Sequence, residues 1–82
     1  MSTLAKIRKY LETRCVNEGK NMPCVLELSN SHVATYYNLN RLSSKAKRSF
    51  ASDLLINGGE LGMALKGDKG SYFLIEISPV LD

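Results

Sequence analysis

The stretch from Ser43 to Ile77 constrains the fold most, because it places a basic helix, a glycine-rich stop and two β-prone runs one after another. Ser43 or Ser44 can accept hydrogen bonds from the free amides of a first helical turn, and either one marks the start of the helix. The apolar residues that follow recur at helical spacing and predict one buried stripe: Ala46, Phe50, Leu54 and Leu55. The charged and hydroxyl residues between them are expected on the other faces, toward solvent or a partner.

The glycines after this helix predict its end and a hairpin. Residues 57–59, Asn-Gly-Gly, are expected to end the helix, because glycine adopts the left-handed C-terminal conformation without a Cβ clash. Apolar residues alternate with small or polar ones over residues 61–65, which predicts a strand. Residues 67–70 have turn chemistry, and residues 72–77 form a second β-prone run.

The N-terminal segment predicts another amphipathic helix, capped by Ser2 or Thr3. Its apolar residues lie three and four positions apart and define one stripe: Leu4, Ile7, Leu11 and Cys15. Its charged residues are expected to face water: Lys6, Arg8, Lys9 and Glu12. The functional alternative for the three cations is a few contacts with backbone phosphates.

The middle of the chain holds two short elements. Residues 24–28 have the length of a strand, and they form either a strand that joins the hairpin or the lead-in to a helix. Asn30 or Ser31 can cap a helix over residues 32–39, with Val33 in the core. Of the adjacent Tyr36 and Tyr37, one ring is expected in the core and the other at the surface.

Composition places the chain among ordinary globular proteins. It has 82 residues, 44% of them apolar and 23% charged, so we expect one domain over residues 1–82. A run of about 18 apolar residues is absent from the sequence, and the N-terminus lacks the separate charged and apolar regions of a signal peptide. We therefore expect a cytoplasmic protein that has no contact with membrane.

The few reactive side chains argue against metal binding and catalysis. Cys15 and Cys24 are the only cysteines, and we expect reduced, partly buried thiols, with a disulfide left open as the alternative. With His32 as the single histidine, a zinc site lacks a fourth ligand, and a nucleophile–base pair is not discernible. The glycines form neither a GxxxxGK[ST] nor a GxGxxG pattern. The sequence predicts a protein that is not an enzyme, with no cofactor, metal or small-molecule substrate.

The expected order is helix, strand, helix, turn, basic helix, strand, strand. This α+β pattern resembles the winged helix-turn-helix domain over nearly the whole chain. The resemblance rests on the apolar positions of the two motif helices and on the exit into the hairpin: Val33, Ala34, Tyr37, Leu39, Ala46, Phe50, Leu54 and residues 57–61. The turn between the motif helices contains no glycine, so Asn38 or Asn40 has to take its place.

The resemblance implies a recognition helix over residues 43–57 and a wing hairpin over residues 61–77. A helix fits the major groove of double-stranded DNA, and its early residues reach the base edges. Arg48 is then the candidate for a bidentate guanine contact, and Lys45 and Lys47 for phosphates. The full set of expected DNA-binding residues is Arg41, Ser44, Lys45, Lys47, Arg48, Ser49, Lys66 and Lys69. The competing interpretation is a solvated helix face and a solvated turn.

These features predict a small DNA-binding transcriptional regulator, such as the accessory regulators of phages or plasmids. A module of this size buries a limited area on DNA, so specificity calls for a homodimer or a protein partner. The apolar strand over residues 72–77 either packs on the first helix or offers an edge for self-association. The alternative function is a protein–protein interaction module, or a subunit of an assembly, on the same fold and without DNA binding.

Overall fold

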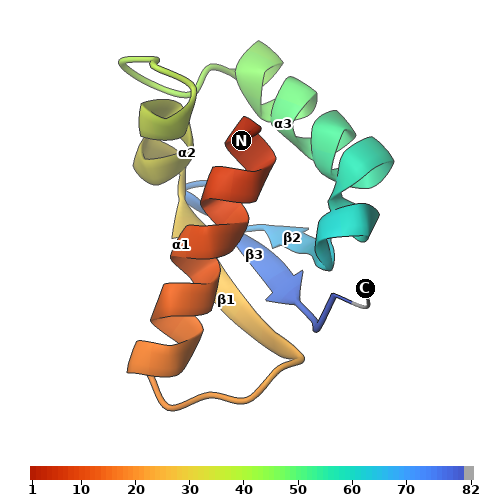
Figure 1. Cartoon of the computed structure of the whole chain (residues 1–82). Coiled ribbons are helices and arrows are strands. Elements are labelled where there is room, and N and C mark those ends of the chain that lie inside the picture. Colours follow the sequence, from red (N-terminus) through yellow and green to blue (C-terminus); the bar gives the residue numbers. More distant parts are fainter. Residues whose placement is uncertain (81–82) are drawn as a thin grey trace.

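A computed structural model describes residues 1–80, which form three α-helices, a short 3₁₀ helix and one three-stranded sheet (Figure 1). The elements in chain order are α1 Thr3–Asn17, β1 Cys24–Ser29, α2 Asn30–Tyr36, α3 Ser44–Asn57, the 3₁₀ helix η1 Gly58–Leu61, β2 Met63–Asp68 and β3 Tyr72–Ile77. This is the α+β order that the sequence predicts. Among the described residues no helix combines the length and the apolar character needed to cross a membrane.

The sheet is antiparallel throughout, with the strand order β1-β3-β2. Residues 24–29 are therefore a strand and not the lead-in to a helix: Cys24 pairs with Ile77 and Ser29 pairs with Tyr72. The strand β3 lies in the centre, with β1 on one side and β2 on the other, so it offers no free edge. The expectation of an edge at residues 72–77 is wrong, and the alternative that this strand packs on the first helix is confirmed.

The core lies between the helices and one face of the sheet. Figure 1 shows α1 passing in front of the sheet, with α2 and α3 beside it. Alternate residues of β3 face this core, because side chains of a strand point to opposite faces in turn. The buried apolar side chains come from every strand and α-helix: Leu4, Ile7, Leu11, Cys15, Leu26, Leu28, Val33, Phe50, Leu54, Met63, Phe73, Ile75 and Ile77. The apolar stripe predicted for the first helix is thus confirmed.

Each α-helix begins at a serine whose hydroxyl accepts a backbone N–H three positions on. Ser2 caps α1 and Ser43 caps α3, as expected. The cap of α2 is Ser29, and not Asn30 or Ser31. The last residue of β1 has the extended backbone that a cap needs, so strand runs directly into helix and α2 lies earlier than the predicted residues 32–39.

The helix α3 ends at Asn57, but the left-handed glycine expected directly after it lies further along the chain. Gly58 has a right-handed φ of −65°, and the chain continues through η1 until Gly62, whose φ is +63°. A Cβ at Gly62 would lie 2.4 Å from the Ser78 carbonyl oxygen, so close packing also requires a glycine there. Because η1 takes up Leu61, the second strand begins at Met63, two residues later than predicted.

The stripe predicted for α3 is wrong at its last member. Phe50 and Leu54 are buried and Ala46 is half-buried, but the Leu55 side chain is 87% exposed. Successive helical residues are about 100° apart, so when Leu54 faces the core its neighbour faces away. Leu55 and Ile56 therefore form an exposed apolar pair.

Arg8 is the clearest departure from the sequence-based expectation. Lys6 and Lys9 are not buried, as predicted, whereas only 7% of Arg8 is accessible. Its Nη1 donates to the carbonyl oxygens of Leu61 (3.0 Å), Gly62 (3.0 Å) and Ser78 (2.7 Å). Its Nε donates to Glu12 at 2.6 Å. The prediction that Arg8 faces water is wrong, because its guanidinium joins α1 to the connections before β2 and after β3.

Candidate nucleic-acid interface

The first half of α3 presents a polar and basic face to solvent. Four of the residues expected to bind DNA lie on it, and none is buried: Ser44, Lys45, Arg48 and Ser49. Their arrangement follows from Phe50 and Leu54, which turn the opposite side of the helix into the core. Arg41, which is exposed, reaches the same region from the preceding turn.

The turn between α2 and α3 places Arg41 beside the helix. Asn38 has a φ of +58°, so it is the asparagine that takes the left-handed position expected of Asn38 or Asn40. The backbone N–H of Leu39 returns to the Ala34 carbonyl at 2.8 Å. Leu42 packs against the core and fixes the chain before the Ser43 cap.

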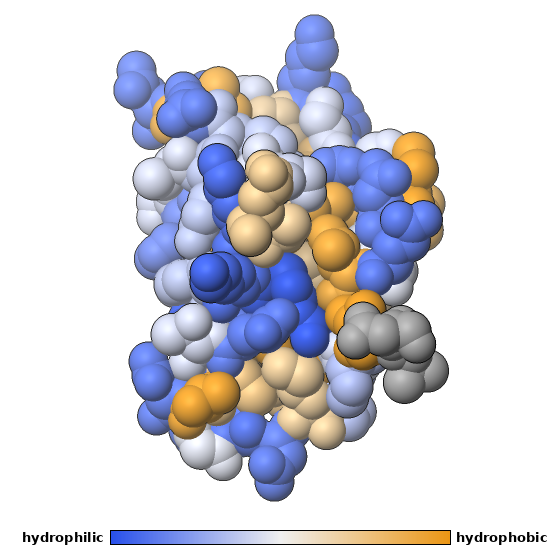
Figure 2. Space-filling view, in the orientation of Figure 1, coloured by the Kyte–Doolittle hydropathy of each residue, from blue (hydrophilic) through white to orange (hydrophobic). Residues whose placement is uncertain are grey.

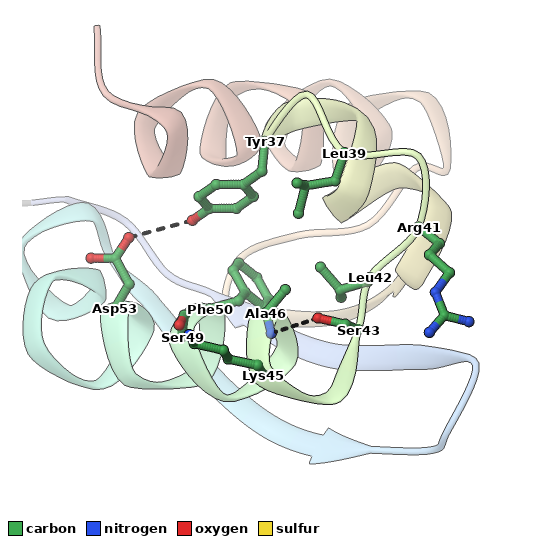
Figure 3. A pocket seen from close by; sticks show the side chains of 10 residues that line it. All are labelled: Tyr37, Leu39, Arg41, Leu42, Ser43, Lys45, Ala46, Ser49, Phe50 and Asp53. Atoms are coloured by element: carbon green, nitrogen blue, oxygen red, sulfur yellow. Dashed lines mark hydrogen bonds between the residues drawn. The ribbon is translucent and has the colours of Figure 1, made fainter.

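A groove of about 570 Å³ lies between this turn and α3 (Figure 3). Its lining is an apolar floor with a polar rim: Tyr37, Leu39, Arg41, Leu42, Ser43, Lys45, Ala46, Ser49, Phe50 and Asp53. Figure 3 places Arg41 at one end and the Tyr37–Asp53 hydrogen bond, 3.4 Å long, at the other. Burial raises the pKa of Tyr37 to about 12, and the nearby Asp53 carboxylate adds to the shift. The cations on the rim are Arg41, from the α2–α3 turn, and Lys45, from the start of α3.

Tyr36 and Tyr37 are both half-buried, and both pack against the core. Tyr37 meets Phe50 edge-on at 6.1 Å between centroids. Tyr36 lies 6.1 Å from Tyr10, which in turn stacks on His32 at 4.7 Å. The predicted division into one core ring and one surface ring is wrong, because α2 ends at Tyr36 and its last turn lies over α1 and α3.

Lys47 differs from its neighbours because the fold engages its ammonium group. Its Nζ lies 3.1 Å from an Asp68 carboxylate oxygen and donates to the Gly70 carbonyl at 3.1 Å. It also stands 5.4 Å from the centroid of the Phe73 ring, and its side chain is only 21% exposed. Lys47 therefore fastens α3 to the β2–β3 turn and is less open to a phosphate than Lys45 or Arg48.

The β2–β3 turn is held on its other side by α2. Asn30 donates from its side-chain Nδ2 to the Gly70 carbonyl at 2.7 Å, and its backbone N–H donates to the Ser71 carbonyl at 3.0 Å. Asp68 accepts the Gly70 N–H at 2.8 Å. This bond, together with the Lys47 ammonium, lowers the pKa of the Asp68 carboxyl. The hairpin is thus fixed between two helices and does not project as a free flap.

Of the two hairpin lysines expected to bind DNA, Lys66 and Lys69, one is engaged in an ion pair and the other is not. Lys66 lies 3.7 Å from Glu76 in an ion pair across β2 and β3. Lys69 is exposed at the turn, and no ion pair engages it among residues 1–80. The structure therefore brings Lys69 near the start of α3, through the contact between Lys47 and the turn, and leaves Lys66 on the sheet.

Sequence reasoning missed Asn30 as a residue that positions this region. The sequence indicates Asn30 only as a helix cap, and its partner Gly70 lies 40 positions away along the chain. No local pattern in the sequence indicates such a contact, since it depends on how the sheet places β1 beside β3.

The second half of α3 has a different character from the first. Leu55 and Ile56 are 87% and 73% exposed, and Leu55 borders a mainly apolar hollow of about 510 Å³ between α3 and β2. Figure 2 shows apolar surface along the side of the molecule that α3 occupies in Figure 1. The helix thus has a basic half and an apolar half.

No group of three metal-ligating side chains comes together within residues 1–80. Comparison of the chain with protein families, with curated proteins and with solved structures gave no match.

Proposed function

We propose that this protein is a small DNA-binding transcriptional regulator of the winged helix-turn-helix type, with α3 as the recognition helix. The observation that carries the proposal is a group of solvent-accessible cations at one end of α3. Lys45 and Arg48 lie in the first half of α3, Arg41 lies in the turn before it, and Lys69 lies in the β2–β3 turn; none has an ion pair within the described residues. Cations that the fold leaves unpaired are the ones available to replace counterions on phosphates.

The proposed roles follow from the position of each side chain. Arg48 projects from the solvent-facing side of the helix and would read guanine, because a guanidinium fork matches two acceptors on that base. Arg41, Lys45 and Lys69 would contact phosphates, with the hydroxyls of Ser44 and Ser49 as further donors. Lys47 would act indirectly, by holding the hairpin turn against α3.

The regulator would act by occupying its site, without a cofactor. A single domain of this size contacts few base pairs, so useful specificity would come from a homodimer or a second protein on adjacent DNA. An accessory regulator of a phage or plasmid fits this architecture, and a cytoplasmic location follows from the proposed partner.

The test is the fluorescence anisotropy of a labelled random-sequence duplex, titrated with the protein at several salt concentrations. We expect binding that weakens steeply with salt. The slope of log K against log salt is negative. In the triple variant Arg41→Gln, Lys45→Gln, Arg48→Gln it should become shallower by about 0.9 for each phosphate that is no longer neutralised. The double variant Lys6→Gln, Lys9→Gln is the matched control, since both lysines lie on α1 and neither is buried.

Two results would count against the DNA-binding proposal. One is the absence of binding at low salt. The other is an equal reduction of slope per cation removed, three in the triple variant and two in the control, because this would assign the binding to net charge and not to α3.

The second candidate function is a protein-interaction module, and the exposed Leu55 and Ile56 favour it. Soluble domains seldom expose neighbouring large apolar side chains beside an apolar hollow without a partner. This candidate predicts a protein that does not bind the duplex and that self-associates independently of salt, an association that the double variant Leu55→Gln, Ile56→Gln abolishes in sedimentation equilibrium. A monomer that binds DNA would exclude it.

A further inference from the structure

The two thiols of the chain lie against each other, away from the region discussed above. Cys15 is in the last turn of α1 and is 2% exposed, and Cys24 is the first residue of β1 and is half-buried. Their Sγ atoms are 3.3 Å apart, and the Cys24 thiol is placed to donate to Cys15. The Cys15 thiol in turn donates to the Lys20 carbonyl at 3.2 Å.

Both thiols are held at this separation by the fold. Cys15 belongs to the buried stripe of α1, and Cys24 pairs with Ile77 at the end of the sheet. A disulfide has a bond of about 2 Å, so the sulfur atoms need to approach by little more than about 1 Å, which side-chain rotation can supply. Nine positions separate the two residues in the sequence, and the segment between them is mostly exposed.

We infer that Cys15 and Cys24 form a site of reversible thiol oxidation, at which a low-molecular-weight disulfide such as oxidised glutathione converts the pair into an intramolecular disulfide. This inference goes beyond the proposed DNA binding and does not depend on it.

The accessible thiol reacts first. The Cys24 thiolate attacks one sulfur of oxidised glutathione, forms a mixed disulfide and releases one reduced glutathione. The Cys15 sulfur then attacks the Cys24 sulfur, and the proton that Cys15 gives up passes to the second glutathione, which leaves as a thiolate and becomes the thiol. The two protein thiols are oxidised by two electrons in total, and one oxidised glutathione becomes two reduced molecules.

The environment of Cys24 makes the first step slow. Burial raises the pKa of the Cys24 thiol, and the hydrogen bond to Cys15 raises it further. A small fraction is therefore the reactive thiolate at neutral pH. The second step is intramolecular, between sulfur atoms already in contact, so the mixed disulfide should not accumulate.

The new bond would fasten the end of α1 to the start of β1. Closing a loop of this length reduces the entropy of the unfolded chain, and this corresponds to a rise in the unfolding midpoint on the order of 10 °C. The bond lies at the end of the sheet opposite the β2–β3 turn, because Cys24 pairs with Ile77 whereas Ser29 pairs with Tyr72 beside that turn (Figure 1). The DNA affinity of the oxidised protein should therefore equal that of the reduced protein.

The experiment equilibrates the whole protein with mixtures of oxidised and reduced glutathione, blocks the remaining thiols with iodoacetamide and measures the intact mass. We expect a species that carries no carbamidomethyl group and is lighter than the unalkylated reduced protein by two hydrogens, monomeric on a non-reducing gel, with a peptide map that joins Cys15 to Cys24. Its unfolding midpoint should exceed that of the reduced protein and return to it after dithiothreitol.

Single variants separate the two roles. Cys15→Ser should accumulate the glutathione adduct on Cys24, because no resolving thiol remains. Cys24→Ser should react much more slowly with iodoacetamide and glutathione, since Cys15 is buried. If the wild-type protein instead accumulates glutathione adducts or intermolecular dimers, or stays fully reduced in oxidised glutathione alone, the inference is wrong.

Discussion

Replacing Arg8 with Met should destabilise the protein far more than the loss of a surface charge would. The methionine side chain keeps much of the apolar stem of arginine and removes the guanidinium. That group donates through Nη1 to the carbonyls of Leu61, Gly62 and Ser78, all within 3.0 Å. The variant leaves these carbonyls facing an apolar side chain in a region where the arginine is 7% exposed.

The magnitude follows from those three acceptors. A hydrogen bond to a charged group contributes about 1.5–3 kcal/mol, and an unsatisfied buried acceptor costs about 1–3 kcal/mol. The three bonds share one nitrogen and the carbonyls lie near the surface, so we expect a total destabilisation of about 3 kcal/mol rather than their sum. The whole free energy of unfolding of a domain this size is about 4–12 kcal/mol, at about 0.05–0.15 kcal/mol per residue.

Urea unfolding, followed by far-ultraviolet circular dichroism, gives the free energy of unfolding of each variant. Lys9→Met is the matched control, because Lys9 follows Arg8 in α1, carries the same charge and is exposed. It should change stability by less than about 0.5 kcal/mol. A destabilisation below about 1 kcal/mol for Arg8→Met would refute the reasoning, because water would then be satisfying the carbonyls.

Three further predictions concern the turn before β2, the groove and the hairpin. Gly62→Ala should lower the free energy of unfolding in urea by about 3 kcal/mol, because φ is left-handed there and the new Cβ would lie 2.4 Å from the Ser78 oxygen. Gly59→Ala is the control: a Cβ there meets open space, so stability should change by less than about 1 kcal/mol. Tyr37 has a pKa raised to about 12, so its protonated state stabilises the fold below the unfolded pKa of about 10. This contribution disappears as pH rises toward 12, and Tyr37→Phe should remove the last phase of a tyrosinate absorbance titration. Asp68 has a lowered pKa, so its contribution is present at neutral pH and disappears as pH falls through that pKa; an NMR titration of its carboxyl should give a midpoint below the ordinary aspartate value.

The regular elements could be predicted because their causes are local. The strand over residues 72–77 has the bounds that its β-prone run indicates, and the stripe of α1 is buried as its spacing predicts. Serine caps mark two of the three helix starts correctly. Each of these features depends on residues within a turn or a strand of one another, which a single sequence displays directly.

The contacts that Arg8 and Lys47 make with other elements could not be predicted, because those partners are distant in the sequence. Arg8 donates to residues 53, 54 and 70 positions away, and Lys47 to residues 21 and 23 positions away. Helical spacing places Arg8 four residues after the buried Leu4 and three before the buried Leu11, at the border of the stripe, where an arginine can turn either outward or inward. Only the position of the strands decides between the two.

The candidate site changes in the same way when the fold is known. Lys47 and Arg48 are adjacent and carry the same charge, so the sequence predicts both as DNA-binding residues. The fold engages Lys47 with Asp68 and leaves Arg48 exposed. If α3 binds DNA, Arg48→Gln should lower affinity directly, whereas Lys47→Met should first loosen the hairpin turn. Comparing the two variants in salt-dependent binding and in unfolding therefore distinguishes a residue that meets the phosphate backbone from one that positions the surface.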